Sequence, residues 1–184
     1  MDTKKILLQQ TKYRLEQVLT RINTTLDVND LAEKYVQEVY IIEPTAQNLL
    51  IVEVKDEDVS QVIKFDLLAA AGFVASLIGG VGGADNPLLL GAFIISSVSS
   101  FLGLFNQASS AEALLFWVLY NMVGHKGDRK MVQKNFESLC KESEEVEVAD
   151  FFAALQRLME MGVIKQRDNL LEIADKLVHI WYRE

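Results

Sequence analysis

The amino-acid sequence predicts a mainly α-helical protein with a minor β component, divided into a helical domain over residues 1–108 and a second domain over residues 109–184. Three observations predict this class. Only two prolines occur in 184 residues, which favours long helices. Apolar side chains recur at helical spacing near both ends of the chain. Between them, from Asp66 to Phe105, lies a stretch without lysine or arginine that is rich in glycine, alanine and serine.

This central stretch, residues 66–105, is predicted to form two apolar helices joined by a turn over residues 82–87. Small residues recur four positions apart in both arms, so they would share one helix face. Small side chains on such a face let two helix backbones approach closely. We expect the helix-packing residues to be Ala71, Ala75, Gly79 and Gly83, with Gly72, Ser76 and Gly80 beside them, and Ala92, Ser96 and Ser100 in the second arm.

The apolar helical hairpin has two interpretations. At ~1.5 Å per residue its arms would be about 26 to 28 Å long, close to the roughly 30 Å hydrocarbon core of a bilayer. The flanking basic residues, Lys64 and those between Lys126 and Lys134, would then lie on one side of the membrane, as the positive-inside rule requires. Glycine and serine lower the hydrophobicity of both arms, which favours a buried core. We prefer the core and keep the membrane hairpin open.

The N-terminal segment, residues 3–26, carries an apolar stripe at helical spacing and is predicted to be an amphipathic helix. A second helix is predicted over residues 31–39, because Asp30 followed by Glu33 has the pattern of a capping box. The charged residues of the first helix fall on its other faces, outside the stripe; they are Lys5, Lys12, Arg14, Glu16 and Arg21.

A small β-hairpin is predicted over residues 40–54. Residues 40–42 and 48–54 are rich in β-branched side chains and flank a polar turn that contains Pro44. A pair of strands of this size needs the rest of the domain for stability. From Val59 we expect the chain to run as a helix through Phe65 into the first arm of the central hairpin.

After a polar linker at residues 106–110, the last third of the chain has the order helix, helix, helix, strand, strand. His125–Gly127 is read as a turn, Asp128 as a helix cap, and Gly162 as a helix stop. Six apolar residues of the third helix are expected to face inward: Val148, Phe151, Phe152, Leu155, Leu158 and Met159. The expected elements are helices over 111–123, 129–141 and 148–161, strands over 163–165 and 170–172, and a terminal helix from Ala174, with a wing strand over 174–182 as the alternative.

The segment from Leu155 to Ile164 resembles the third helix, terminating glycine and first wing strand of the winged-helix superfamily. The resemblance covers the last third of the chain and implies a module that binds DNA or protein. In DNA-binding members the third helix lies in the major groove and carries basic or amide side chains. Here Arg157 is its one positive charge, and the other outer positions are Glu147, Asp150, Gln156 and Glu160. This composition favours a protein partner.

A basic cluster precedes that helix and is the candidate phosphate or nucleic-acid patch. A solvated helix face is the simpler interpretation of such a run. The net charge of −8 also weighs against nucleic acid, because affinity for it depends on neutralised phosphates. The residues of this basic cluster are Lys126, Arg129, Lys130 and Lys134.

The residues that carry chemistry are sparse and scattered. The single cysteine, Cys140, excludes an internal disulfide and a cysteine-rich metal site. The glycine run at residues 79–83 lacks the following Lys-Ser or Lys-Thr of a phosphate-binding loop. His125 and His179 stand far apart in the sequence, and no pairing of Cys140 with His125 is indicated. We therefore expect no catalytic set, no metal site and no cofactor.

These observations lead to one preferred hypothesis and two alternatives. The preferred function is a non-enzymatic accessory or adaptor subunit of a larger intracellular assembly, acting through contacts with a partner protein or with its own copies. The first ten residues lack the apolar run of a signal peptide, so we expect a cytoplasmic location. The alternatives are a membrane-associated effector or regulator that inserts residues 66–105, and a DNA-binding regulator that uses residues 109–184.

Overall fold

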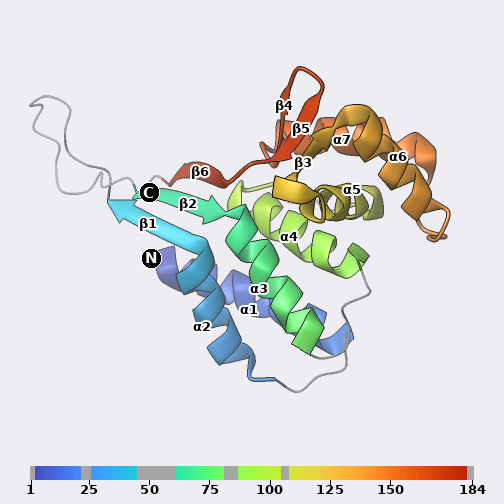
Figure 1. Ribbon diagram of the computed structural model, residues 1–184. Helices are drawn as coiled ribbons and strands as arrows, with labels where there is room; N and C mark the ends of the chain where they lie inside the picture. Colours follow the sequence, from blue (N-terminus) through green and yellow to red (C-terminus); the bar gives the residue numbers. More distant parts are fainter. Residues whose placement is uncertain (1–2, 22–25, 45–60, 81–86, 105–107, 182–184) are drawn as a thin grey trace, which may run out of the picture.

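Figure 1 shows the computed structural model of the chain, which describes residues 3–21, 26–44, 61–80, 87–104 and 108–181. Within these residues seven α-helices make up most of the fold, and the strands form two three-stranded antiparallel sheets. The mainly α-helical class with a minor β part is therefore confirmed. One sheet lies beside the first three helices, and the other lies beside the last three (Figure 1).

The first two helices are α1 (Thr3–Arg21) and α2 (Val28–Val39). Helix α2 begins earlier than predicted because the Asp27 carboxylate accepts a hydrogen bond from the Asn29 backbone N–H at 2.8 Å. Asp27 is thus the N-cap, and the predicted cap at Asp30 is wrong. A single carboxylate three residues earlier decided the start of the helix.

The first sheet has the strand order β1 (Tyr40–Pro44), β2 (Gln61–Asp66) and β6 (Lys176–Trp181). Tyr40, Phe65 and Leu177 are register partners across the three strands, and all three side chains are buried. The last strand of the chain therefore completes a sheet that begins near the N-terminus.

Two predictions for this sheet are wrong. The helix predicted from Val59 through Phe65 is strand β2 from Gln61 onward, and the terminal helix predicted from Ala174 is strand β6. The alternative of a strand over residues 174–182 is right about the strand, but β6 pairs with β2 of the first sheet and not with the wing. In β2 the buried Ile63 and Phe65 alternate with half-buried neighbours, which is the two-residue period of a strand. Such short runs fit either period, and pairing with a distant segment decides between them. The second strand predicted at residues 48–54 lies outside the described residues, where nothing tests it.

The two arms of the predicted hairpin are helices α3 (Leu67–Gly80) and α4 (Pro87–Phe101). Strand β2 passes directly into α3, because the Asp66 carboxylate accepts a hydrogen bond from the Ala69 N–H at 2.9 Å. The arms contact each other, but α4 packs most extensively against the next helix, α5 (Ser110–Tyr120). In the described part of the chain, no helix has the length and apolar character that crossing a lipid bilayer requires.

The small residues of the two arms have different surroundings. On α3 Ala71 is buried and Ala75 half-buried, whereas Gly72 and Ser76 are exposed. A Cβ atom on Gly72 would meet no other group within 4 Å, so this glycine makes no close helix contact. The remaining positions are the half-buried Ala92, Ser96 and Ser100 on α4, the terminal Gly79 and Gly80 of α3, whose surroundings are outside the description, and Gly83, which lies outside the described residues.

The closest helix approach occurs at a glycine that the four-residue pattern leaves out. A Cβ atom on Gly91 of α4 would overlap the backbone of Ala113 on α5. Glycine is needed here because any side chain would push the two backbones apart. Small-residue packing at Gly91 therefore joins α4 to α5.

The last third of the chain follows α5 in the order β3 (Lys126–Asp128), α6 (Arg129–Cys140), α7 (Phe151–Glu160), β4 (Ile164–Arg167) and β5 (Leu170–Ile173). Short 3₁₀ turns, Val123–His125 and Val148–Asp150, precede β3 and α7. The strand order is β3–β5–β4. The turn predicted at residues 125–127 is partly wrong, because Lys126 and Gly127 belong to β3. Gly162 follows α7 with φ +73°, as the predicted helix stop requires.

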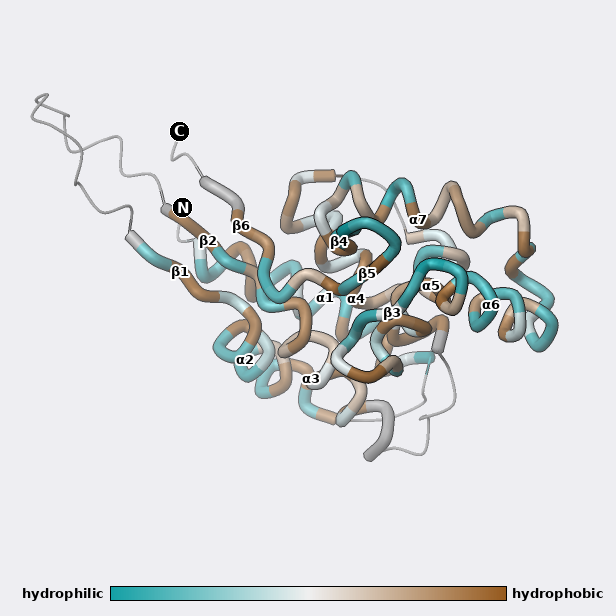
Figure 2. The backbone as a smooth tube through the Cα atoms, turned by 45° about the horizontal axis from the view of Figure 1, so that its top comes forward, coloured by the Kyte–Doolittle hydropathy of each residue, from teal (hydrophilic) through white to brown (hydrophobic). Residues whose placement is uncertain are grey.

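The apolar core continues from one end of the chain to the other. Residues of α3, α4 and α5 contribute much of this core, and hydrophilic segments cover β3 and the β4–β5 turn as well as parts of α2 and α6 (Figure 2). Two contacts span the predicted boundary near residue 108: the Leu67 N–H donates to the Asp175 carbonyl at 3.1 Å, and the Ser99 hydroxyl lies 3.6 Å from the Met161 sulfur. Residues on both sides of that boundary therefore share one core.

Candidate functional site

The candidate site is built on α5, a helix that is buried on nearly all sides. Its first turn holds Glu112, which is only 3% exposed and which forms a capping box with Ser109. The Glu112 carboxylate also pairs with the guanidinium of Arg157, with 3.1 Å between Oε1 and Nε. Because Arg157 belongs to α7, this ion pair fixes α7 on α5. It also occupies the one cation of α7, which was predicted on the outer face of that helix.

The start of α6 is held by two hydrogen bonds. The Asp128 carboxylate accepts from the Lys130 N–H at 2.9 Å and caps the helix. The Arg129 N–H donates to the Asn169 carbonyl at 2.7 Å, in the turn between β4 and β5. The side chain of Arg129 is thereby placed between that turn and the beginning of α7.

The outward face of α7 is apolar at two positions. Phe152 is 54% exposed and Met159 is 38% exposed, while Phe151, Leu155 and Leu158 are buried. The prediction that Phe152 and Met159 face inward is therefore wrong, as it is for Val148, which is exposed in the preceding turn. Seven of the ten residues in α7 are apolar, more than one inward stripe can hold. That excess was the signal that could have identified the exposed pair.

A groove of about 480 Å³ runs along α7 beside β4. The guanidinium carbon of Arg129 lies 5.3 Å from the centre of the Phe152 ring, a cation–π contact that closes one side of the groove. Among the described residues Arg129 makes no ion pair, so its charge can still pair with an incoming carboxylate. The groove is lined by Arg129, Phe152, Leu155, Gln156, Met159, Glu160 and Gln166.

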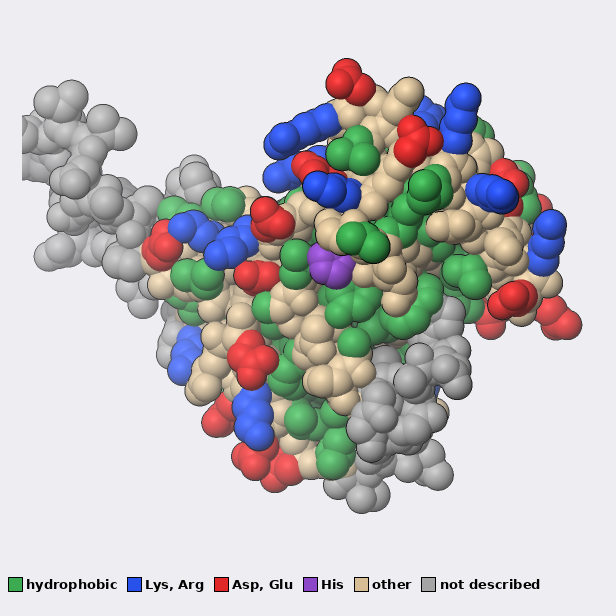
Figure 3. All heavy atoms as spheres, in the orientation of Figure 1, with side chains coloured by type: hydrophobic (Ala, Val, Ile, Leu, Met, Phe, Trp, Pro, Cys, Tyr) green, Lys and Arg blue, Asp and Glu red, His purple; other side chains and the backbone are tan. Residues whose placement is uncertain are grey.

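The basic cluster predicted from the sequence is divided between surfaces. Arg129 faces the groove, whereas Lys130 and Lys134 lie one turn apart on the exposed part of α6. Lys126 is exposed on β3, in register with Glu172 of β5. Cations and carboxylates are mixed over this part of the surface, with hydrophobic side chains exposed among them (Figure 3).

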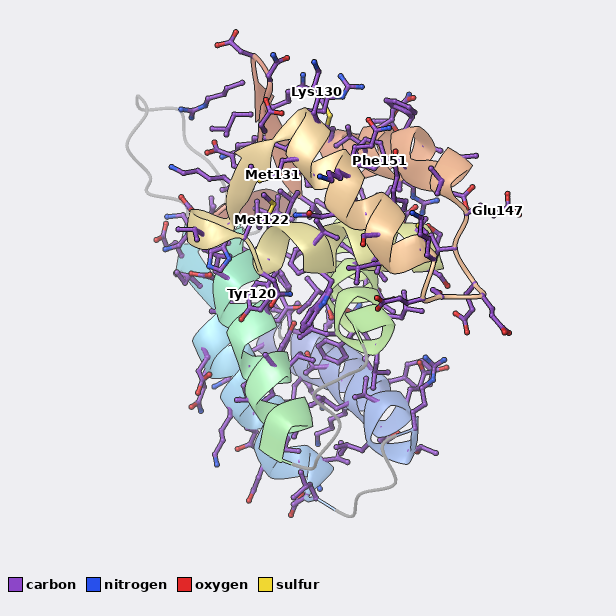
Figure 4. All side chains as sticks on the ribbon, turned by 45° about the vertical axis from the view of Figure 1, so that its right-hand side comes forward. Tyr120, Met122, Lys130, Met131, Glu147 and Phe151 are labelled. Carbon is purple, nitrogen blue, oxygen red and sulfur yellow. The ribbon has the colours of Figure 1, made fainter. Side chains whose placement is uncertain are left out.

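Charge is nevertheless separated along the helical pair α6 and α7. Lys130 stands at the start of α6, and Glu147 stands at the turn before α7 (Figure 4). Acidic residues fill the connector between them, at Glu142, Glu144 and Glu145. The α6 end near the groove is thus its cationic end, and Phe151 points inward between the two helices (Figure 4).

Cys140 and His125, two potentially reactive side chains of the sequence, both have a role in the packing of the fold. Burial raises the pKa of the Cys140 thiol, with smaller contributions from Asp150 and Glu137, so the thiolate is disfavoured. His125 donates its Nδ1–H to the Tyr120 carbonyl at 2.7 Å and stacks on the Tyr120 ring, so it caps a carbonyl at the end of α5. No three histidine, cysteine or carboxylate side chains gather as metal ligands in the described part of the chain.

Comparison with known proteins finds no matching family model, no significantly similar curated protein and no significantly similar solved structure. The function is therefore inferred from the groove, from the charges around it, and from the order of the elements that form it.

Proposed function

We propose that this chain is a non-enzymatic adaptor subunit that binds a partner protein through the groove along α7. The observation that carries the proposal is the exposure of Phe152 and Met159 on a helix whose inward face is already well packed. Exposed aromatic and methionine side chains are enriched at the centres of protein interfaces. When a partner covers these two side chains, their apolar surface is removed from water, and this burial favours binding.

The order α5, β3, α6, α7, β4, β5 supports the winged-helix interpretation of residues 109–184. In the winged-helix arrangement three helices accompany a small sheet. Here α7 occupies the position of the third helix, which reads DNA in DNA-binding members. The third strand of that sheet, β3, adds to the resemblance that the sequence indicated. We therefore assign α7 as the recognition element of this module.

The composition of α7 favours a protein over DNA as the partner. Its single cation, Arg157, is engaged with the buried Glu112 and is not free to neutralise a phosphate. Its outward positions add an acidic group, Glu160, which would repel the DNA backbone. The DNA-binding alternative then depends on Lys126, Lys130 and Lys134, none of which lines the groove.

The groove indicates the chemistry of the partner. Its floor, formed by Phe152, Leu155 and Met159, suits a large apolar side chain. Arg129 stands beside that floor with an unpaired charge, so a carboxylate next to the apolar residue would gain a charge-assisted hydrogen bond. We propose a partner segment with a large apolar residue next to an aspartate or glutamate. The same proposal places the chain in the cytoplasm and leaves the membrane hairpin as the alternative.

A peptide-display selection on the immobilised full-length chain tests the proposal. Random 12-residue peptides are selected, and the enriched sequences are compared between the natural chain and variants. We expect enrichment of a large apolar residue beside Asp or Glu. Phe152→Glu should weaken binding of the enriched peptides about tenfold or more, because it places a charge on the floor of the groove. Arg129→Glu should shift the preference from acidic to basic residues.

Val123→Glu is the matched control, because Val123 is an apolar residue that is 95% exposed in the turn after α5, away from the groove. It should bind the same peptides as the natural chain. If no sequence is enriched, or if Phe152→Glu and Val123→Glu behave alike, the proposal fails. Binding of duplex DNA that weakens with salt and with Lys130→Glu would instead support the DNA-binding alternative.

A further inference from the structure

A group of polar side chains is buried in the helical layer formed by α1, α2 and α4, far in the sequence from the groove. Thr11 and Arg14 come from α1, Tyr35 from α2, Tyr40 from the start of β1, and Ser97 from α4. Thr11, Tyr35 and Ser97 are each 1% exposed. The Tyr35 hydroxyl faces Ser97, the Tyr40 hydroxyl faces Thr11, and Arg14 lies near both phenols. We call these five residues the buried polar cluster.

The hydrogen bonds of this cluster are incomplete. Within the described residues, four buried side-chain atoms have no hydrogen-bond partner: Thr11 Oγ1, Arg14 Nη1, Tyr35 Oη and Ser97 Oγ. All four belong to the buried polar cluster. Buried polar atoms in folded proteins nearly always have partners, and exceptions usually mark an ion, a water molecule or a functional group. Tyr35 lies beside Ser97 and Tyr40 beside Thr11, so these hydroxyls can partly satisfy one another. The guanidinium of Arg14, which lies near both phenols, has no acidic partner among the described residues, and this charge indicates a common partner for the cluster.

The cluster also carries a positive charge, on Arg14, that no negative group of the described residues balances. Burial lowers the pKa of Arg14, although the nearby Tyr40 and Tyr35 oppose this effect. Burial raises the pKa of Tyr35 well above its usual value and that of Tyr40 to about 12, so both phenols are neutral donors near pH 7. No carboxylate of the described residues pairs with Arg14. The cluster thus presents one positive charge and four hydroxyl groups without a negative counterpart.

We propose that the buried polar cluster binds a small oxyanion, a carboxylate or a phosphate group, between Arg14 and the hydroxyls of Thr11, Tyr35, Tyr40 and Ser97. A guanidinium offers a planar pair of N–H donors that matches both groups. Arg14 is half-buried, so the site can be reached from the outer side of α1. Water molecules could satisfy the hydroxyls, but they would leave the guanidinium charge without compensation.

Thermal unfolding of the full chain in sodium phosphate and in sodium acetate, each titrated at constant ionic strength, tests the site. An anion that binds the folded state raises the Tm along a saturable curve, whereas general salt effects on the surface do not saturate. We expect saturation with one of the two salts, and the salt that saturates at the lower concentration identifies phosphate or carboxylate as the ligand. Line broadening of the phosphate ³¹P signal or of ¹³C-labelled acetate gives an independent readout.

Arg14→Met keeps the aliphatic part of the side chain and should weaken the saturable component about tenfold to hundredfold. Arg21→Met, an exposed arginine at the end of the same helix, is the matched control and should behave as the natural chain. If Arg14→Met does not fold, Ser97→Ala and Tyr35→Phe keep the charge and should weaken binding roughly twofold to tenfold. A natural chain whose Tm and line widths do not saturate with either anion overturns the proposal.

Discussion

Two regions of this molecule depart from the usual separation of apolar core and polar surface, and they do so in opposite directions. The region of α1, α2 and α4 buries Nη1 of the half-buried Arg14, together with four hydroxyl groups, among apolar neighbours. The region of α5, α6, α7 and β4 pairs its buried carboxylate, Glu112 of α5, with Arg157 of α7 and exposes Phe152 and Met159. The first has polar groups that lack partners, and the second has apolar surface that lacks a cover.

The difference indicates what each region can bind. Unsatisfied buried donors gain most from a compact, charged acceptor, whereas exposed aromatic and methionine side chains gain most from apolar contact. The two regions meet at the α4–α5 contact, where Gly91 lies against Ala113. A change in one region can therefore be tested for its effect on the other, with stability as the common measure.

The strongest test compares adjacent phenylalanines of α7. Phe151 is fully buried and Phe152 is more than half exposed, although both are apolar and neighbours in the sequence. Phe151→Ala should lower the free energy of unfolding by about 4 kcal/mol, the usual cost of emptying a core site. Phe152→Ala should lower it by less than about 1 kcal/mol. Urea denaturation monitored by tryptophan fluorescence measures both, and equal losses would contradict the outward assignment of Phe152.

The next test concerns the α4–α5 contact that joins the two regions. Gly91→Ala should destabilise the fold by about 3 kcal/mol, because the new Cβ atom would overlap the Ala113 backbone. Gly72→Ala is the matched control in the neighbouring helix, where the Cβ atom meets open space. It should stabilise the fold by about 0.5 to 1 kcal/mol through helix propensity. Changes of the same sign in the two variants would mean that α4 and α5 are not closely packed.

Local chemistry allowed much of this fold to be predicted from the sequence. The two helical arms, the helix cap at Asp128 and the helix stop at Gly162 follow from composition and capping residues. Strand β2 was not predicted, and for β6 a helix and a wing strand both stayed open, since each segment is too short for its period to exclude a helix. Their pairing joins residues from opposite ends of the chain, which local patterns do not record.

The sites were harder to predict than the fold. Small residues four apart indicated a packing face, but Gly72 is exposed and the close contact is at Gly91, outside the pattern. Arg14 was placed on a polar face of α1, although its guanidinium lies partly in the core. The groove could not be predicted, because Arg129, Phe152 and Gln166 come from α6, α7 and β4 and are brought together by the fold. Tertiary packing decides such details, and sequence spacing does not specify it.

The last test examines the buried polar region through its pH dependence. Burial raises the pKa of Tyr40 from 10 to about 12, because the ionised phenolate is poorly solvated there; Arg14 and Thr11 oppose the shift. Below pH 10 the phenol is neutral in both the folded and the unfolded chain. Between pH 10 and 12 the unfolded chain loses this proton first, so stability falls as pH rises, by about 2.5 kcal/mol at pH 12. Tyr40→Phe should remove this part of the decline.

The measurement is urea denaturation of the natural chain and of Tyr40→Phe at intervals from pH 8 to pH 12. The difference in stability between the natural chain and Tyr40→Phe should stay constant up to pH 10 and then shift in favour of the variant, because the variant lacks the group that titrates in the unfolded chain. Tyr35→Phe should reduce the alkaline decline in the same direction, since burial also raises the pKa of Tyr35. Curves that stay parallel to pH 12 would mean that the phenols reach solvent, and the contrast between a closed polar region and an open apolar groove would then be lost.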